Sequence, residues 1–195
     1  MNVRSGDKKQ KILKATMELI AENGLHNTPM SQVSKRSGVS AGAIYSYFKS
    51  KEEIINHLYL DLKTEIRDAA LENYDINMPY EDRFFLVWHN FLDYLLNNSS
   101  KMSFVEQCST SPLISPEARE EGKRRLAPVQ GFVMEGIEAG KFKDIDIELI
   151  YSLIYSSIIS AAKLHLSGNL TLTDEMKQET ARCCWDGLRR RNESE

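Results

Sequence analysis

The chain has 195 residues, of which 42% are hydrophobic and 27% charged, as expected of a globular protein that forms its own core. No apolar run reaches the ~18 residues that a membrane span requires, and the charged first residues are not followed by the apolar stretch of a signal peptide. Three cysteines without framework spacing, Cys108, Cys183 and Cys184, argue against a secreted disulfide-rich protein, so we expect a cytoplasmic location.

The net charge of −3 at pH 7 conceals two parts of opposite sign. Residues 1–51 contain nine Lys and Arg against three Asp and Glu, whereas the remaining residues contain sixteen against twenty-five. A basic first part on an acidic remainder suggests that only the first part meets a polyanion. A solvated helix face without any partner explains the same charges equally well.

The first part of the chain is expected to begin with two helices. Asp7 and Gln10 have the spacing of a capping box, which predicts the start of the first helix, and Gly24 supplies its left-handed end. The second helix is expected to start near Thr28, with Pro29 at the first helical position.

Two further helices follow closely. Gly38 ends the second helix, and Ser40 is placed to cap a third over residues 41–47. Ser50 and Glu53 have the spacing of another capping box, which predicts the start of a long fourth helix. Its buried stripe follows the helical period: Ile54, Leu58, Leu62, Ile66 and Ala69.

Three short helices with a glycine turn between the second and third are typical of a helix-turn-helix, whose third helix enters the major groove of DNA. Ile44 and Phe48 lie four residues apart and share a face that Val39 can join, so this face should hold the third helix to the head. The other side carries the residues left to meet a partner: Gly42, Tyr45 and Ser46, with Tyr47 at its edge.

The chemistry of this other side suits DNA. The small residues Ala41 and Gly42 let the backbone approach base edges, while Tyr45 and Tyr47 offer a ring to a thymine methyl or a hydroxyl to a phosphate. Lys51 in the first turn of the fourth helix opposes the helix dipole, which makes sense if the lysine and the helix terminus hold a phosphate together. The alternative is that both tyrosines pack on the rest of the protein and that Lys51 is merely solvated.

Residues 8–60 resemble the DNA-binding head of the tetracycline-repressor (TetR) family of transcriptional regulators. The matching stretches are "KILKATMELIAENGL", "MSQVSKRSGVSAGAIYSYFKSKEEI" and "INHLY". The resemblance implies DNA contacts at Ser40, Ala41, Gly42, Tyr45, Ser46, Tyr47 and Lys51, with Thr28 and Ser31 near a phosphate contact of the second helix. It also implies a DNA-binding domain at residues 1–50 and an effector-binding and dimerisation domain at residues 51–195.

The head departs from the family pattern at a few positions. Pro29 stands where a Thr or Ser cap is common, so we expect Thr28 to take the cap. Ala41 and Ala43 stand where many members carry polar side chains. Base reading is therefore expected from Tyr45, Ser46 and close backbone approach rather than from those two positions.

The remainder of the chain also reads as helices. Apolar residues surround most of a fifth helix between Pro79 and Asn97, so we expect it to be buried on several sides. Ser115 and Pro116 predict a new start, and Pro128 should break or kink the helix that follows. The prediction is thus an all-α protein of about nine helices, with a helix-turn-helix head and a helical ligand-binding body.

The last two helices are the expected dimer interface. The stretch "DIELIYSLIYSSIISAAKLHLSG" is apolar but rich in Ser and Ala, which allows another helix to approach closely, and Thr173 should cap a final helix. Two such helices from each chain form a four-helix interface, as the resemblance also implies. The alternative is that they only close the core of one chain.

The resemblance implies a small-molecule pocket in the body that controls the head. The candidate pocket residues are the large apolar and aromatic ones of the fifth to eighth helices: Trp88, Phe91, Tyr94, Phe104, Phe132, Met134, Tyr151 and Tyr155. Each of them fits a packed core as well, but as a set they suggest an apolar cavity for a lipophilic effector.

The sequence offers little for catalysis. The adjacent Cys183 and Cys184 point about 100° apart on a helix and are poorly placed to chelate one metal ion. The four histidines show no metal-ligand spacing, and neither a nucleophile–base pair nor a phosphate loop is recognisable.

We expect no enzyme, metal or cofactor, but a homodimeric repressor released from a palindromic operator by a lipophilic molecule. Alternatives are a helical carrier or enzyme with a vestigial head, and a redox sensor through Cys108.

Overall fold

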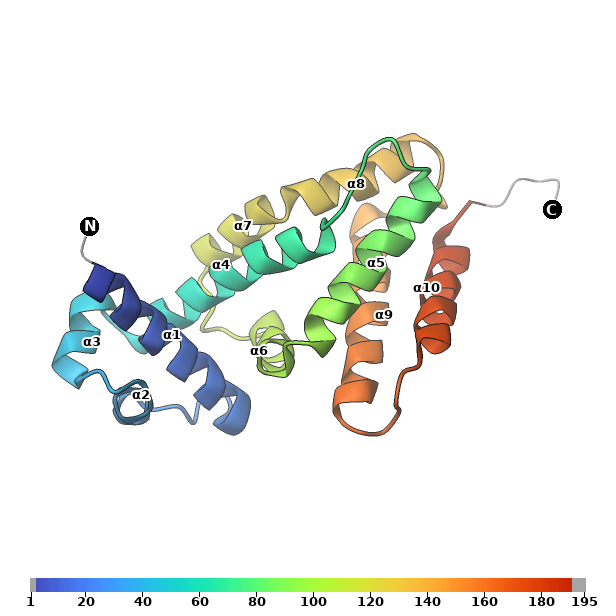
Figure 1. Ribbon diagram of the computed structural model, residues 1–195. Helices are drawn as coiled ribbons and strands as arrows, with labels where there is room; N and C mark the ends of the chain where they lie inside the picture. The colour runs from blue at the N-terminus through green and yellow to red at the C-terminus, as the bar shows by residue number, and fades with distance from the viewer. Residues whose placement is uncertain (1–2, 191–195) are drawn as a thin grey trace. The chain divides into compact units, whose positions relative to one another are not determined.

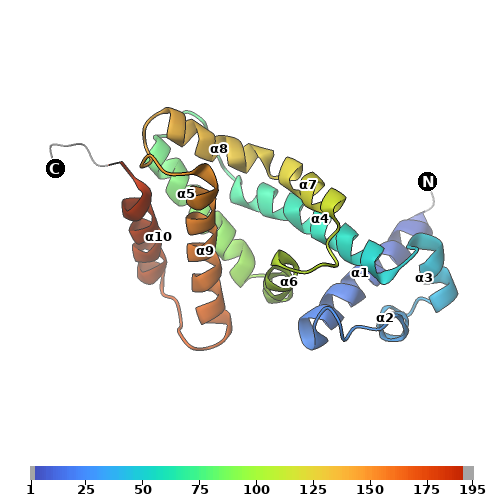
Figure 2. The ribbon, with the colours of Figure 1, turned by 180° about the vertical axis from the view of Figure 1, so that it is seen from behind.

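The computed structural model describes residues 3–190 (Figures 1 and 2). Within this range it contains ten α-helices and no strand apart from an isolated bridge between Phe142 and Arg189. The helices are α1 (Val3–Asn23), α2 (Met30–Ser37), α3 (Ala41–Tyr47), α4 (Lys51–Ala70), α5 (Tyr80–Leu96), α6 (Ser99–Ser109), α7 (Pro116–Arg125), α8 (Ala127–Glu138), α9 (Ile147–Leu166) and α10 (Asp174–Leu188). The predicted all-α fold with a helix-turn-helix head is confirmed.

The described chain divides into two compact units. The first unit contains the described residues up to Lys63 together with Asn98–Arg124, and therefore holds α1–α3, the first part of α4, α6 and nearly all of α7. The second unit contains Thr64–Asn97 and the described residues from Arg125 on, including α5 and α8–α10. The head thus shares a unit with α6, which packs against α1.

The turns of the head form where the sequence has glycines. Gly24 and Gly38 have φ angles of 86° and 67°, a left-handed conformation that favours glycine at the end of a helix. The start of α1 differs from the prediction, because the helix already begins at Val3. Asp7 forms an ion pair with Lys11 (Oδ2 to Nζ, 2.7 Å) inside the helix, so the capping box predicted there is wrong.

The start of α2 also differs from the prediction. Pro29 is the residue before α2 and makes no capping hydrogen bond with a side chain. Thr28 is fully buried, and its hydroxyl donates to the carbonyl oxygen of Gly24 at 3.0 Å. The prediction that Thr28 caps α2 is therefore wrong, because its side chain closes the preceding turn instead.

The predicted starts of α3 and α4 are confirmed. The Ser40 hydroxyl accepts a hydrogen bond from the Ala43 backbone N–H, which caps α3. The Ser50 hydroxyl accepts one from the Glu53 N–H at 3.2 Å, at the start of α4. The buried stripe of α4 contains Ile54, Leu58, Leu62 and Ile66 as expected, but ends with Ala70 in place of Ala69.

The second unit is built around α5, which lies beside α9 and α10 (Figure 1). Its buried residues surround much of the helix, as predicted: Tyr80, Arg83, Phe84, Val87, Trp88, Phe91, Leu92 and Leu95. An aromatic cluster joins α5 to the C-terminal helices, with ring centres 4.8 Å apart for Tyr80 and Phe132 and 5.0 Å apart for Phe84 and Trp185. Such pairs contribute beyond the area that they bury.

A buried arginine lies beside this aromatic cluster. The Arg83 guanidinium donates two hydrogen bonds to the Glu135 carboxylate, at 2.6 and 2.8 Å, and one to the Tyr74 hydroxyl at 2.6 Å. It also lies over the rings of Tyr80 and Phe132, at 5.2 and 6.0 Å from their centres. The paired geometry offsets the cost of burying the charge. The Arg83 hydrogen bonds hold the pKa of Glu135 below its usual range.

The other predicted helix boundaries of the body agree with the structure. The Ser115 hydroxyl caps α7 by accepting from the Ala118 N–H at 3.1 Å. Pro128 lies in the first turn of α8 directly after α7 ends, so it marks the expected break. Thr173 caps α10 by accepting from the Met176 N–H at 3.2 Å.

Helix α9 is apolar along much of its length. Within residues 3–190 it is the one helix long and apolar enough to cross a membrane, a property that core helices of globular proteins share. Only four of its residues are fully buried: Ile150, Ile158, Ala161 and Ala162. Three of its leucines are exposed: Leu149, Leu153 and Leu164.

Candidate nucleic-acid interface and effector site

The third helix presents one buried and one exposed face, as its periodicity predicts. Ile44, Phe48 and Val39 are at most 5% exposed and fasten α3 to the head. The exposed side carries Ser40, Ala41, Gly42, Tyr45 and Ser46, with Tyr47 partly buried at its edge. Tyr45 is 53% exposed, so its ring is accessible to a partner. The structure therefore brings six of the predicted DNA contacts together on one short helix and its cap.

The hydrogen bonds of these residues show which groups remain available. The Ser46 hydroxyl donates to the Ala43 carbonyl oxygen at 2.6 Å, which leaves its lone pairs for a donor on a partner. A Cβ atom on Gly42 would meet no other atom within 4 Å, so the surface at Gly42 is open to close approach. The backbone of α3 is thus accessible where the sequence predicted contact with base edges.

The two predicted contacts of α2 differ in exposure. Ser31 is exposed in the first turn of α2, in agreement with a position that faces a phosphate. Thr28 is fully buried and its hydroxyl is engaged by Gly24, so its side chain is not available to DNA. We correct that assignment, because a buried hydroxyl cannot reach a phosphate without unfolding the turn.

Lys51 lies at the first position of α4, as expected. Its Nζ atom donates to the His26 carbonyl oxygen at 3.4 Å, and burial lowers the pKa of its ammonium group. This contact is long for a hydrogen bond and holds the ammonium near the turn that precedes α2. An arriving phosphate would therefore meet a lysine that is already directed by the head.

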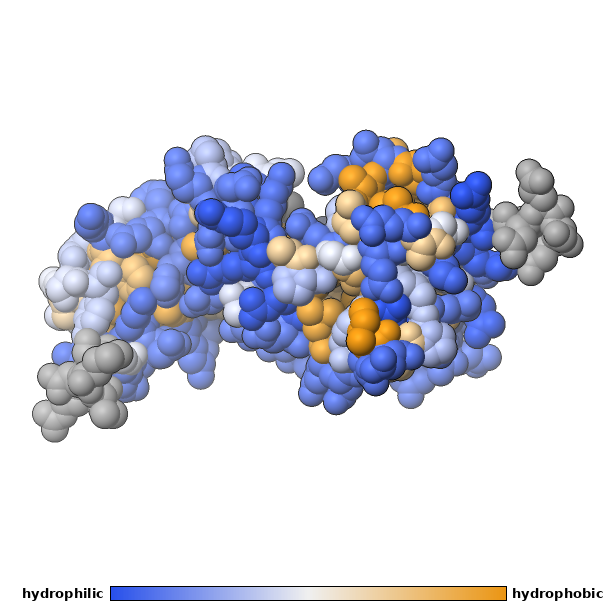
Figure 3. Space-filling view, turned by 90° about the horizontal axis from the view of Figure 1, so that it is seen from above, coloured by the Kyte–Doolittle hydropathy of each residue, from blue (hydrophilic) through white to orange (hydrophobic). Residues whose placement is uncertain are grey.

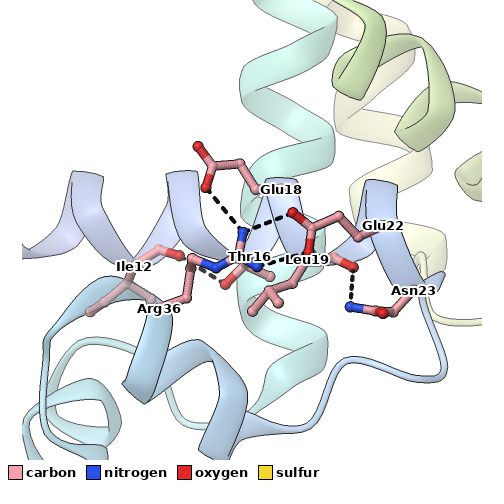
Figure 4. Close-up of polar contacts among 7 residues, drawn as sticks. All are labelled: Ile12, Thr16, Glu18, Leu19, Glu22, Asn23 and Arg36. Carbon is pink, nitrogen blue, oxygen red and sulfur yellow. Dashed lines mark hydrogen bonds and ion pairs between the residues drawn. The ribbon is translucent and has the colours of Figure 1, made fainter.

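An exposed arginine of α2 forms ion pairs with α1 (Figure 4). Arg36 on α2 donates two hydrogen bonds to the Glu22 carboxylate on α1, at 2.8 and 2.9 Å, and lies 3.6 Å from Glu18. These hydrogen bonds lower the pKa of Glu22 and raise that of Arg36. The pair is exposed, so it contributes little to the stability of the fold.

The candidate effector residues do not all belong to one unit. Most lie in the second unit, on α5, α8 and α9: Trp88, Phe91, Tyr94, Phe132, Met134, Tyr151 and Tyr155. Phe104, fully buried on α6, belongs to the first unit with the head. Met134 on α8 is 42% exposed, so this chain does not enclose it as expected of a pocket residue.

Several of the remaining candidates lie where α9 meets α5 and α8, whereas Phe132 of α8 stacks on Tyr80. Trp88 is fully buried, and its indole N–H donates to the Ser157 hydroxyl at 3.0 Å. Phe91 and Tyr155 have ring centres 6.2 Å apart. The Tyr151 hydroxyl donates to the Gln130 carbonyl oxygen at 2.9 Å, from α9 to α8. These residues connect three helices of the second unit through apolar and aromatic contacts.

Sequence reasoning missed several residues of the aromatic cluster. Tyr80, Phe142 and Trp185 contact one another with ring centres 5.8–6.1 Å apart. A Cβ atom on Gly136 would lie only 2.1 Å from the Tyr80 hydroxyl, so this glycine permits the ring to lie against α8. In the sequence, Gly136 is the feature that could have indicated the close approach of a ring to α8.

We next consider a redox-active cysteine and a metal site within the described residues. Burial raises the pKa of the Cys108 thiol to about 12, so the reactive thiolate is disfavoured at neutral pH. In residues 3–190 no group of three or more His, Cys, Asp or Glu side chains is placed to hold a metal ion.

The exposed apolar residues are concentrated toward the C-terminal end of the described chain. Most of the surface seen in Figure 3 is hydrophilic, with hydrophobic side chains exposed in places. Leu149, Leu153 and Leu164 are 44–56% exposed on one face of α9, and Met176 on α10 is 38% exposed. Ser156 and Ser160 lie exposed between the leucines of α9. This face combines leucines with small residues, as helix–helix interfaces do.

Two family models match the chain. One, described as "Bacterial regulatory proteins, tetR family", matches residues 12–58, which include α2, α3 and the start of α4. The other, described as "Tetracyclin repressor-like, C-terminal domain", matches residues 79–189, more than half of the chain. The match thus extends from the candidate DNA interface to the last helix.

Relatives of known sequence and structure are regulators of the same kind. The fatty acid metabolism regulator protein of Bacillus subtilis is 28% identical over 154 residues, which cover 77% of this chain and 79% of that protein. A TetR family transcription regulator from Marinobacter aquaeolei has the same fold, with a TM-score of 0.90 and 22% identity over 98% of this chain and all of that one. FadR from Bacillus subtilis, solved in complex with stearoyl-CoA, has a TM-score of 0.74 and 22% identity over 91% of this chain and 98% of that one. The chain therefore belongs to the tetR family of bacterial regulatory proteins and is a ligand-responsive, DNA-binding transcriptional regulator.

Proposed function

We propose that this regulator is a cytoplasmic homodimeric repressor, which a fatty-acyl compound, in the form of an acyl-CoA or a free acid, releases from a palindromic operator. The observation that carries the DNA part is the exposed face of α3, where Tyr45 is 53% exposed beside open backbone at Gly42. A ring and an accessible backbone on a recognition helix suit the major groove.

The fatty-acyl part rests on the relatives and on the second unit. The Bacillus subtilis relative is named for fatty acid metabolism, and the FadR structure contains stearoyl-CoA. In this chain, Trp88, Phe91 and Tyr155 bring apolar and aromatic surface together between α5 and α9. An acyl chain requires such surroundings, because binding sites for lipophilic ligands are mostly apolar with a few polar groups for orientation.

The dimer part rests on the apolar face of α9. Leu149, Leu153 and Leu164 are roughly half exposed there, with small serines between them. A second copy related by two-fold symmetry would cover the same face on both chains. The dimer would present two α3 helices to successive major grooves, with half-site centres ~34–36 Å apart in the simplest case.

Release of DNA requires that the effector bind the two states of the dimer with different affinity. In the proposed mechanism, the DNA-bound state has the spacing of the two α3 helices that matches the operator, and the effector-bound state has another spacing. Residues 1–50 then act as the DNA-binding domain and residues 51–195 as the effector-binding and dimerisation domain.

The test uses the full chain and a duplex selected from a random pool. We expect a near-palindromic sequence, an affinity that falls steeply with salt, and release of the duplex by palmitoyl-CoA or palmitate but not by CoA alone. In a Trp185→Phe background, the emission of Trp88 should change over the same concentration range. Selection of no sequence would exclude the DNA part, whereas release by neither palmitoyl compound would exclude the fatty-acyl effector alone.

A further inference from the structure

One lysine of α1 is directed toward the end of α3. Lys9 is partly buried, whereas Lys8, Lys11 and Lys14 of the same helix are exposed. The Lys9 Nζ atom lies 5.7 Å from the centre of the ring of Phe48, the residue that follows α3. Helices α1 and α3 are in contact, and the start of α1 lies beside α3 in Figure 1. Lys9 therefore belongs to the surroundings of the DNA-binding helix.

The period of α1 explains this position. Ile12, Leu13 and Thr16 belong to the buried face of the helix and are at most 3% exposed. Lys9 lies three and four positions before Ile12 and Leu13, so it continues the same face toward the start of the helix. A lysine at the edge of an apolar face covers that face with its methylene stem and keeps its ammonium in water.

The surroundings of Lys9 provide a ring but no carboxylate. Within residues 3–190 its ammonium forms no ion pair, whereas Lys11 is paired with Asp7 at 2.7 Å. A cation–π contact holds the ammonium near the ring face without supplying an oxygen acceptor. Since an ammonium has three N–H donors, Lys9 can donate to the oxygen of a partner while it remains over Phe48.

The partner that this location fits is the DNA backbone. Phe48 comes directly after the exposed side of α3, which includes Tyr45 and Ser46. A helix in the major groove has phosphates on either side, and contacts with them fix its register. The ammonium of Lys51 is held near the turn before α2, by the His26 carbonyl oxygen. Lys9 supplies a cation beside the end of α3 instead.

We propose that Lys9 is a further DNA-contacting residue of this regulator, which binds a backbone phosphate beside the end of α3 and is positioned by the ring of Phe48. Lys9 lies before residues 12–58, which match the family model of the head, so this contact is a feature of the present chain. The proposal requires DNA binding, but neither a palindromic operator nor a fatty-acyl effector. The alternative is that Lys9 packs on Phe48 and only stabilises the head.

The first arm of the test measures the salt dependence of binding to a duplex of random sequence. Lys9→Met keeps an apolar side chain and removes the charge. One phosphate contact contributes about 0.9 to the slope of log affinity against log salt, so the advantage of wild type over Lys9→Met should shrink about 3-fold between about 50 and about 200 mM salt. Lys9→Arg should retain the wild-type slope. Lys14→Met removes an exposed charge from the same helix and is the matched control. Equal slopes for Lys9→Met and Lys14→Met would overturn the proposal.

The second arm locates the phosphate on the duplex selected from the random pool. One backbone phosphate at a time is replaced by a neutral methylphosphonate, and each duplex is titrated with wild type, Lys9→Met and Lys14→Met. We expect at least one position where the replacement weakens wild type and Lys14→Met but leaves Lys9→Met unchanged, because the partner of that phosphate is already absent. If every replacement weakens Lys9→Met by the same factor as wild type, Lys9 contacts no phosphate and the proposal is wrong. Selection of no sequence would concern the operator, and the first arm would then decide the role of Lys9.

Discussion

The backbone N–H of Leu25 donates a hydrogen bond of 2.8 Å to the Oε1 atom of Gln107, which joins the end of α1 to α6 across 82 positions of the chain. The Nε2 atom of Gln107 donates to the Ile20 carbonyl oxygen at 3.2 Å. Backbone groups at the end of a helix need such partners, and here a side chain of α6 supplies two of them. The Gln107 amide therefore adds two hydrogen bonds to the packing of α6 against α1.

The first prediction concerns this amide. Gln107→Ala should lower the free energy of unfolding by about 1–3 kcal/mol, because it removes the partner of the Leu25 N–H. The Ile20 carbonyl oxygen keeps its hydrogen bond from the Gly24 N–H at 2.8 Å. The variant should also weaken the release of DNA by the effector, if α6 carries the signal to the head. Urea denaturation and operator binding with and without effector measure the two effects. Gln178→Ala, at an exposed position of α10, is the matched control, and equal behaviour of both variants would contradict the prediction.

The second prediction separates base reading from phosphate binding. Tyr45→Ala should weaken binding to the operator more than binding to random DNA, by about 1–3 kcal/mol, if its exposed ring contacts bases as proposed. Lys51→Ala should weaken both alike and reduce the salt slope by about one. Titrations at several salt concentrations measure both quantities. A loss for Tyr45→Ala that is equal on operator and random DNA would show that Tyr45 is not a reader.

The third prediction concerns the pH dependence of stability. The folded state raises the pKa of Cys108 to about 12, so it binds the thiol proton more tightly than the unfolded state does. This contribution is fully present below about pH 8.5, the ordinary pKa of a thiol, and is lost as the pH rises toward 12. The unfolding free energy should therefore fall more steeply with alkaline pH in wild type than in Cys108→Ala.

A thiol reagent provides an independent check in a Cys183→Ser/Cys184→Ser background. Cys108 is 2% exposed, so it should react slowly in the native protein and completely in urea. Fast reaction of the native protein at pH 8 would contradict the buried, protonated thiol and would restore Cys108 as a candidate redox sensor.

The fourth prediction tests the dimer interface. Leu153→Glu places a charge on the exposed apolar face of α9, so the proposed dimer should dissociate. Ile76→Glu is the control, because Ile76 is 62% exposed in the connection between α4 and α5. Sedimentation equilibrium measures the mass of each variant. A Leu153→Glu variant that remains dimeric would move the interface away from this face.

Several features follow from the sequence alone because they depend on residues three or four positions apart. Ser40 and Thr173 cap the helices that follow them, and Gly24 and Gly38 adopt the left-handed conformation that ends a helix. The two faces of α3 follow from its period in the same way. The candidate DNA interface was predictable for this reason, with Thr28 as the exception.

The features that the sequence did not determine depend on contacts between distant residues. Thr28 stands at a position suited to a helix cap, but its hydroxyl donates to the Gly24 carbonyl oxygen instead, and the side chain is buried. Met134 is a large apolar residue of the kind that lines pockets, yet the packing of α8 leaves it 42% exposed. The local sequence shows which side chain stands at such a position, but the tertiary structure decides which groups that side chain contacts.

The sequence by itself determined the helices, the head and the family of this protein, because capping, helical period and composition are local properties of the chain. Only the tertiary structure decided that α6 belongs to the same unit as the head, and that Gln107 of α6 is hydrogen-bonded to the backbone of Leu25 and Ile20. Leu25 and Gln107 are 82 positions apart, and Ile20 and Gln107 are 87 apart. No periodicity spans such separations, so these relationships arise only when the helices pack.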